Sequence, residues 1–498
     1  MLSIAAAIVS AALMWAAFPP LDLGFLVFIA PTPFLWALRR VRSRREAGWL
    51  GFVFGTVFFG GMLWWIFILG AVAWFPLTGV MALYAVLYGL LLYLVRMWSP
   101  WRWWAVAVGG WAMWELVRAR FPLNGFPWGS AGYPVGTIPG MRGSAQWIGP
   151  TGWGVLVVAF AAALVLMTEE PRDRRPLEVT VGIILALTVL GAMVGPDAGG
   201  RELSVAIVQG NSPCPRVHCE NEKERIYNAH LALTRTIEAG SADLVVWGED
   251  SFGGNFNPTT NPEVRSQMAG EAVRIGAYLL AGGTRSVDTE HFENLNLVFG
   301  PDGAVVGEYL KQHPVPFGEY IPMRGLLEDL IPQFDAVPRD MVRGSGPVVF
   351  DLFDGEVSLS SVISFEGAFI RTMRAQARAG ANVMVVTTNE GSYGRGPASD
   401  QLIGMVRMNG TALGVDVAQA AVTGRSAFVT AGGSIGETTA LFTETIHRGS
   451  IAVQGSGRTL YTMTGDWLQL LAILGAVAVL ISGYREPREF RIRPEVRR

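Results

Sequence analysis

Charged residues are scarce in this 498-residue chain. They make up 16% of it, whereas hydrophobic residues make up 51%, with 17 Trp and 26 Phe. Ordinary soluble proteins carry about 25% charged residues, so the composition excludes that class and indicates a membrane protein with a sizeable soluble part. The net charge of −2 provides no basic excess, which argues against a nucleic-acid partner.

Cysteine is also scarce. The chain has only Cys214 and Cys219, which excludes a disulfide-rich scaffold, and it has no Cys-x-x-Cys pair. The spacing leaves two alternatives open: a disulfide, or two free thiols that flank His218 by chance. Internal repeats and low-complexity linkers are absent from the sequence, and no metal or cofactor is predicted.

Eight long apolar stretches are the dominant feature. Most approach the length of about 17–25 residues that crosses a bilayer as a helix. Each alone is compatible with a buried core helix, but eight stretches with almost no internal charge favour membrane spans, because charges are costly in lipid. The first lacks the basic region of a signal peptide. The stretches are 1–18, 23–38, 49–69, 77–98, 101–117, 149–167, 179–194 and 467–482.

Arginine-rich segments predict the orientation of these spans. With eight spans and a cytoplasmic N-terminus, the four basic segments 39–46, 96–102, 168–176 and 483–498 all lie on the cytoplasmic side. The predicted organisation is a transmembrane domain over 1–194 with an outer loop at 118–148, an extracytoplasmic domain over 195–465, and a last helix with a basic tail over 466–498. The expected location is the plasma or inner membrane. Aromatic residues at 121–134 of the outer loop suit either a membrane-surface anchor or a direct role in lipid binding.

The segment 195–465 is predicted to be an α/β domain. Short runs rich in β-branched residues alternate with helical patterns, which implies a mixed sheet covered by helices. A hairpin is expected to turn on Pro301-Asp302-Gly303. The predicted strands are 203–211, 242–250, 277–284, 357–364 and 381–388, and the clearest predicted helices are 222–239 and 262–276.

Polar side chains follow three of the predicted strands. Ser364 stands where a buried strand changes to helical spacing, a common seat for a nucleophile. Glu249 and Lys311 also follow strands, and a carboxylate, an amine and a nucleophile are the groups that acyl transfer needs. The alternatives are a serine that caps the next helix and two solvated loop residues.

Three motifs make the pattern more specific. VVWGED, YLKQHPVPFGEYIP and SVISFEGAF resemble the motifs of the nitrilase, or carbon–nitrogen hydrolase, superfamily. The spans and FPLNGFPWGSAGY together resemble the apolipoprotein N-acyltransferase family over nearly the full length. The resemblance implies a nitrilase-like αββα sandwich on an eight-helix transmembrane bundle. It also implies a base at Glu249, an oxyanion-stabilising Lys311, a nucleophile at Ser364, a supporting carboxylate at Glu319 and pocket residues Glu366 and Asn389.

The reaction implied by this resemblance has two steps. The nucleophile takes an acyl chain from a membrane phospholipid, typically phosphatidylethanolamine. The acyl group then passes to the α-amine of the diacylglyceryl-cysteine at the N-terminus of a lipoprotein. The expected partners are therefore a phospholipid donor and a lipoprotein acceptor.

The chain departs from the family pattern around the expected pocket. The family has cysteine at the position of Ser364, usually an aromatic residue at Ser392, and usually Arg-Ala-x-Glu at 409–412. Two hypotheses follow: an acyltransferase adapted to serine or reduced in rate, and a non-catalytic homologue. The latter would bind lipid or lipoprotein, or scaffold a partner such as a polyprenol-phosphate mannose synthase. An amide hydrolase is disfavoured because nitrilase-type amidases are usually soluble.

Overall fold

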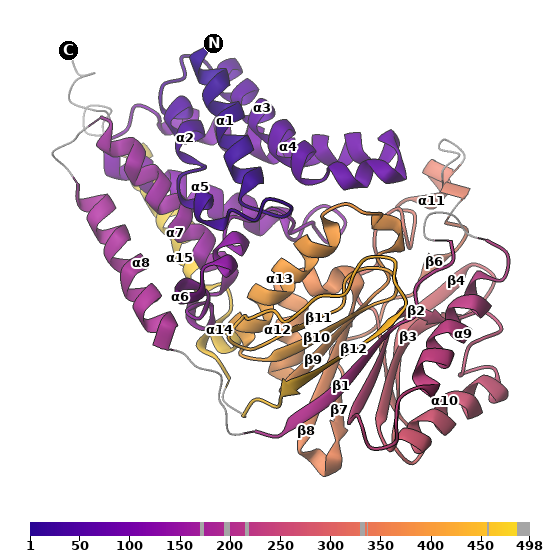
Figure 1. Ribbon diagram of the computed structural model, residues 1–498. Coiled ribbons are helices and arrows are strands. Elements are labelled where there is room, and N and C mark those ends of the chain that lie inside the picture. The colour runs from indigo at the N-terminus through magenta and orange to yellow at the C-terminus, as the bar shows by residue number, and fades with distance from the viewer. Residues whose placement is uncertain are drawn as a thin grey trace, which may run out of the picture. The chain divides into compact units, whose positions relative to one another are not determined.

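The computed structural model describes residues 1–169, 174–193, 200–214, 219–328, 334–335, 337–455 and 458–485 (Figure 1). The chain separates into two compact units. The first comprises Met1–Val194 and Met463–Arg498, and the second comprises Gly195–Thr462.

The first unit is helical, and each of the predicted apolar stretches falls on helical structure. The stretch 23–38 is broken, because the Pro-Thr-Pro sequence at 31–33 supplies few N–H donors and the helix starts afresh there. The elements are α1 (Leu2–Ala16), η1 (Gly24–Phe28), α2 (Thr32–Arg39), α3 (Arg44–Met62), η2 (Trp64–Leu69), α4 (Ala71–Val95), α5 (Pro100–Arg118), η3 (Tyr133–Thr137), α6 (Pro139–Arg142), α7 (Ala145–Met167), α8 (Arg175–Met193) and α15 (Trp467–Arg485).

Four helices in the described part of the chain, α4, α7, α8 and α15, are long and apolar enough to cross a membrane. Of the others, α1 has only 15 residues, and α3 and α5 carry charged residues at their ends. A membrane protein is thus supported, but the predicted eight-helix bundle is not confirmed.

Two buried charged residues at the end of α5, Glu115 and Arg118, organise the loop that follows it. Arg118 donates to the carbonyl oxygens of Phe126 (2.8 Å) and Trp128, and Glu115 accepts from the Ala131 amide at 2.8 Å. Trp128 is fully buried, whereas Phe121 is exposed. The loop is therefore held as a defined structure, and only part of its aromatic surface is free to meet a membrane.

The second unit contains two sheets. In the described residues the larger has seven strands in the order β12-β1-β2-β3-β4-β5, with β6 beside β4, and the smaller has five in the order β11-β10-β9-β8-β7. The strands are β1 (Glu202–Gln209), β2 (Leu244–Phe252), β3 (Tyr278–Ser286), β4 (His291–Phe299), β5 (Val305–Leu310), β6 (Asp340–Met341), β7 (Val349–Leu352), β8 (Val357–Ile363), β9 (Val383–Thr388), β10 (Asp416–Ala421), β11 (Ala427–Val429) and β12 (Thr445–Ala452).

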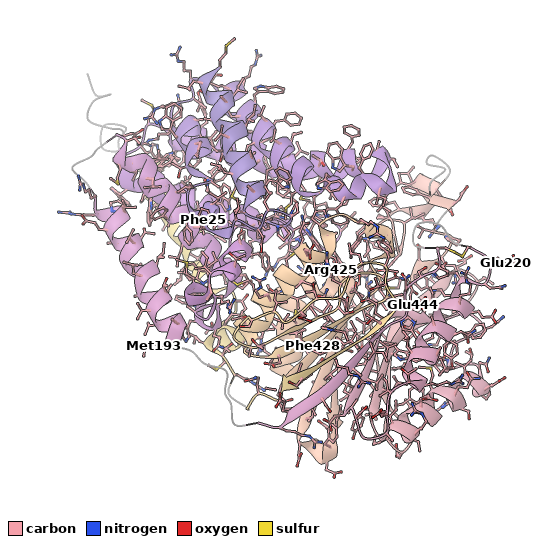
Figure 2. All side chains as sticks on the ribbon, in the orientation of Figure 1. Phe25, Met193, Glu220, Arg425, Phe428 and Glu444 are labelled. Atoms are coloured by element: carbon pink, nitrogen blue, oxygen red, sulfur yellow. A yellow bond between two sulfur atoms is a disulfide. The ribbon has the colours of Figure 1, made fainter. Side chains whose placement is uncertain are left out.

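The two sheets pack face to face between two layers of helices. Along β1, Val205 and Ile207 point into the core between the sheets, and Val208 points to the helices outside, as the two-residue period of a strand requires. Phe428 of β11, which is labelled in Figure 2, also packs into the core between the sheets. Helices α9 (Glu222–Arg235) and α10 (Pro262–Ile275) cover the larger sheet, and α12 (Ile370–Ala379) and α13 (Ala398–Leu413) cover the smaller one. The expected αββα sandwich is confirmed.

Local predictions in this unit agree with the structure. All five predicted strands are present, β4 and β5 form the expected antiparallel hairpin, and Gly303 at its turn has the positive φ of 80° that glycine accommodates. Helix α9 is shorter than predicted and ends at Arg235. Strands β6, β7, β10, β11 and β12 escaped prediction.

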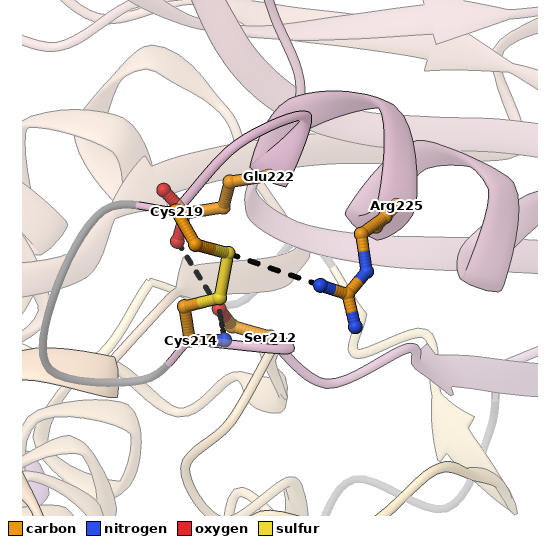
Figure 3. The surroundings of a disulfide bond; sticks show 5 residues. All are labelled: Ser212, Cys214, Cys219, Glu222 and Arg225. Atoms are coloured by element: carbon orange, nitrogen blue, oxygen red, sulfur yellow. Dashed lines mark hydrogen bonds between the residues drawn. A yellow bond between two sulfur atoms is a disulfide. The ribbon is translucent and has the colours of Figure 1, made fainter.

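The two cysteines are joined in a disulfide. Cys214 and Cys219 lie 6.1 Å apart at their Cα atoms, which resolves the alternative left open by their spacing (Figure 3). Ser212 accepts from the Cys214 amide and donates to Glu222 at the start of α9, each at 3.2 Å. His218, between the cysteines, lies outside the described residues.

Candidate active site

Strands of the larger sheet bring three polar side chains close together. Glu249 lies on β2, Asn294 on β4, and Lys311 directly follows β5, whose end is fixed by a bond from the Lys311 amide to the Asn294 carbonyl (2.9 Å). The register of β2 against β3 shifts between Trp247 and Phe252, so Glu249 lies in an irregular part of this strand pair. Strand order therefore brings together residues that lie far apart in the sequence.

Lys311 is the centre of this cluster. Its ammonium lies 3.0 Å from Glu249 Oε1 and 2.6 Å from Glu319 Oε1, and it is 1% exposed. Asn294 Nδ2 donates to the same two carboxylate oxygens, at 2.7 and 3.2 Å. Glu319 is held in turn by the Val315 amide at its other oxygen. The predicted Glu249, Lys311 and Glu319 thus form one hydrogen-bonded unit, with Asn294 as a member that the sequence did not reveal.

Burial and charge pairing set the protonation of this unit. Burial alone would lower the pKa of Lys311, but Glu249 and Glu319 reverse this and raise it, so the amine stays charged. Burial raises the pKa of Glu249 against the opposing effect of Lys311. A carboxylate with a raised pKa is a stronger base, which suits the removal of a proton from a nucleophile.

Ser364 occupies a tight turn directly after β8 of the smaller sheet. Strand β8 ends at Ile363. Ser364 follows with a left-handed φ of 53° and is 7% exposed. A serine in this conformation is uncommon and is typical of strained turns at functional sites. The next α-helix, α12, starts at Ile370 with Phe369 as its N-cap, so Ser364 is not its capping residue.

Glu366 fastens this turn to the loop that carries Lys311. Its carboxylate is fully buried and accepts four hydrogen bonds. Oε1 accepts from the amides of Gln312 (2.6 Å) and His313 (2.9 Å), and Oε2 accepts from the Tyr309 hydroxyl (2.8 Å) and the Ile363 amide (2.9 Å). The donors come from both sheets, so Glu366 couples the position of Ser364 to that of Lys311.

Asn389 makes a second connection between the sheets. It follows β9, and its amide donates to Glu249 Oε2 at 3.2 Å while its side chain donates to Asp250 Oδ2 at 3.3 Å. Burial would raise the pKa of Asp250, but the Lys223 ammonium 2.8 Å away outweighs it and the pKa is lowered. Asn389 therefore contacts the predicted base through its backbone.

The structure locates two of the positions at which the chain departs from the family pattern. Ser392 is exposed. Asn409 on α13 is fully buried and donates to the Gly367 carbonyl at 2.9 Å, which supports the Ser364 turn.

Within the described ranges no group of three or more His, Cys, Asp or Glu side chains is arranged to hold a metal ion.

Glu390, beside Asn389, is a further buried carboxyl. Burial raises its pKa to about 7, and a hydrogen bond from Ser399 opposes the shift only partly. Between pH 4.5 and 7 the folded protein keeps a proton that the unfolded chain releases, so stability falls as the pH rises through this window.

We expect Glu390→Gln to remove this pH dependence. At pH 8 the variant should be more stable by about 3 kcal/mol, because the amide resembles the protonated carboxyl, and at pH 5 the difference should nearly vanish. Melting temperatures at both pH values measure the effect. An equal shift at pH 5 and pH 8 would show that titration of Glu390 is not the cause.

Comparisons with known proteins match both parts of the chain. Residues 10–163 match the apolipoprotein N-acyltransferase N-terminal domain, and residues 204–459 match the carbon-nitrogen hydrolase domain. An apolipoprotein N-acyltransferase of Geobacter metallireducens is 30% identical, covering 96% of this chain and 95% of that protein. Those of Sinorhizobium medicae (30% identical, 81% and 79% covered) and Gloeobacter violaceus (27% identical, 93% and 91% covered) are also similar.

Proposed function

This chain belongs to the apolipoprotein N-acyltransferase family, and we propose that it transfers a fatty acyl chain from a membrane phospholipid to the N-terminal diacylglyceryl-cysteine of lipoproteins. The observation that carries the proposal is the buried Lys311 between two carboxylates, joined through Glu366 to the turn of Ser364.

In the proposed first step, Ser364 Oγ attacks the ester carbonyl of the phospholipid. Glu249 accepts the Oγ proton, and the Lys311 ammonium stabilises the negative charge on the carbonyl oxygen. The ester C–O bond then breaks, and the proton passes from Glu249 to the departing lysophospholipid oxygen. The acyl chain is left as an ester on Ser364.

In the second step, the lipoprotein amine attacks this ester. A C–N bond forms, the bond to Oγ breaks, and a proton from the amine returns to Ser364 by way of Glu249. A serine hydroxyl ionises much less readily than a thiol, so the reaction depends on the strength of Glu249 as a base.

The family has cysteine at the position of Ser364. The serine in this chain therefore favours a second candidate function, that of a non-catalytic homologue that binds lipid or lipoprotein. The two candidates differ in whether an acyl group ever becomes attached to Ser364. The glycosyltransferase partner stays a prediction that neither the fold nor the relatives support.

Acyl-enzyme formation distinguishes the two candidates. We expect the intact mass of the purified protein to increase by one acyl group after incubation with phosphatidylethanolamine vesicles, and the increase to be lost in Ser364→Ala. In cells, deletion of the protein should remove the N-acyl group from lipoprotein N-termini. A mass increase that persists in Ser364→Ala would mean that the serine is not the acceptor.

For the membrane arrangement we propose eight spans with both termini in the cytoplasm and the second unit outside. The disulfide supports this, because such bonds persist in oxidising compartments. Reporters fused after Arg174 and at Gly303 should lie on opposite sides of the membrane. Finding both on one side would refute the topology.

A further inference from the structure

Asp250, the residue after Glu249, is a second carboxylate beside the proposed base. Neighbouring side chains of a regular strand point to opposite faces of the sheet. Asp250 instead has a left-handed φ of 66°, and both carboxylates bond to Asn389. The Asn389 amide donates to Glu249 Oε2 at 3.2 Å, and its side chain donates to Asp250 Oδ2 at 3.3 Å. One residue that follows β9 therefore orients both carboxylates.

Lys223 pairs with this second carboxylate from the helical layer. It lies in the first turn of α9, and its ammonium is 2.8 Å from Asp250 Oδ1. Its stem runs past Gly253, where a Cβ would lie 3.6 Å from both Cδ and Cε of the lysine. Each oxygen of Asp250 thus has its own partner, the ammonium at Oδ1 and the Asn389 side chain at Oδ2.

Both ends of this chain of contacts are fixed. The start of α9, which carries Lys223, is held by the bond from Ser212 to Glu222 at 3.2 Å and by the disulfide just before the helix (Figure 3). At the other end, the Asn389 carbonyl accepts from Thr423 Oγ1 at 2.6 Å. The contacts therefore connect α9 to the proposed base through side chains that have defined positions.

The pair also contributes to the charge around Glu249. Lys311 and Glu319 act on this carboxylate from the loop after β5, and Asp250 acts on it from β2 itself. The Tyr393 phenol also interacts with it, but burial raises the pKa of that phenol, so it stays uncharged. The negative charge of Asp250 raises the pKa of Glu249, so a partner that neutralises Asp250 matters to the base.

We propose that Lys223 and Asp250 are positioning residues for the acyl transfer, which hold Glu249 through Asn389 and keep the charge beside it balanced. The inference rests on the proposed function. The two side chains act through Glu249 and take up no proton in the reaction. Together they carry no net charge, whereas either one alone leaves a charge beside the base, whose sign decides how readily Glu249 ionises.

The test measures the rate of acyl-enzyme formation at a series of pH values. Full-length proteins are incubated with phosphatidylethanolamine vesicles, and the adduct is followed by intact-protein mass. Because Glu249 must be ionised to accept the Ser364 proton, the wild-type rate should fall in acid. The pH at which the rate falls to half, its acid midpoint, is compared between variants.

The two single variants should shift the acid midpoint in opposite directions. Lys223→Met leaves the charge of Asp250 unbalanced, so the midpoint should rise by about 0.5–1 pH unit, a modest shift because the pair is partly exposed. Asp250→Asn leaves the ammonium unbalanced, so the midpoint should fall by about as much. Below the midpoint these shifts correspond to changes of about three- to tenfold in rate at a fixed pH.

Two further variants distinguish charge from structure. The double variant Lys223→Met/Asp250→Asn has no net charge at this position and should return to the wild-type midpoint. Lys223→Arg keeps the positive charge and should also keep the midpoint. A merely structural role would slow both single variants without moving their midpoints in opposite directions.

Arg201→Met is the matched control. Arg201 pairs with Asp243 at 3.3 Å, and the side-chain exposures of 35% and 30% resemble the 36% and 28% of Lys223 and Asp250. Asp243 directly precedes β2, whereas Asp250 lies near the end of that strand. The substitution thus leaves a comparable carboxylate unpaired away from Glu249, and the midpoint should stay at the wild-type value.

The outcomes separate the inference from the proposed function. Midpoints that move in the same direction or not at all, an equal shift in Arg201→Met, or a wild-type rate that does not fall in acid would overturn the inference while acyl transfer stands. If Lys223→Met does not fold, Asp250→Asn decides alone, because its midpoint must still fall. The absence of an adduct on the wild type and every variant would overturn the proposed function together with the inference.

Discussion

Replacing Lys311 with methionine is expected to abolish acyl-enzyme formation and to lower the free energy of unfolding by about 3–5 kcal/mol. The substitution leaves Glu249 and Glu319 as two buried like charges, each of which was within 3.0 Å of the ammonium. It also removes the proposed stabiliser of the oxyanion. Intact-protein mass reports the first effect, and unfolding by denaturant reports the second.

The destabilisation by Lys311→Met should depend on pH. Without the lysine, repulsion from Glu319 adds to burial and raises the pKa of Glu249 further. A carboxyl whose pKa is raised in the folded state is tolerated at low pH, where it is neutral, and reduces stability as the pH rises through that pKa. The loss should therefore be greater at pH 8 than at pH 5.

Arg285 provides the matched control for Lys311. It also lies between two carboxylates, Glu293 at 2.6 Å and Glu308 at 2.9 Å, but its side chain is 23% exposed. Solvent weakens such pairs, so Arg285→Met should reduce stability by about 1 kcal/mol or less and leave adduct formation intact. If both variants lost the same stability, burial would not be what makes Lys311 important.

Glu366→Gln is expected to give the second largest effect, a loss of about 3–5 kcal/mol of stability and a decrease of at least about 100-fold in adduct formation. An amide has one acceptor oxygen and turns its NH₂ group toward donors that Glu366 now satisfies, so buried N–H groups lose their partners. The turn of Ser364 then separates from the loop of Lys311. Displacements of about 1 Å are enough for a rate loss of this size.

Asp416→Asn is the control that distinguishes the loss of stability from the loss of adduct formation expected for Glu366→Gln. Asp416, at the start of β10, is likewise buried and accepts from the amides of Ala431 (2.8 Å) and Ala452 (2.9 Å) and from the Gln454 side chain (2.9 Å). Its substitution should also lower stability, but adduct formation at a temperature where the variant is folded should match the wild type. A comparable loss of adduct formation in Asp416→Asn would mean that Glu366 acts through general stability alone.

The sequence by itself determined the features that depend on local pattern. Apolar length predicted where helices form in the first unit, and short runs rich in β-branched residues predicted β1, β2, β3, β8 and β9. The polar residues at strand ends identified Glu249, Lys311 and Ser364 as candidates, because a polar side chain after a buried strand stands out against its neighbours. The family motifs added Glu319, Glu366 and Asn389.

Only the tertiary structure decided which of these residues meet. Asn294 lies inside an ordinary strand, and its bonds to two carboxylates arise because β4 lies beside β5 and near β2. Three of the four donors to Glu366 lie more than 50 residues away from it in the sequence. Cysteine spacing permitted a disulfide that the folded chain then formed. Strand order and sheet stacking depend on contacts between distant residues, and a local pattern carries no record of such contacts.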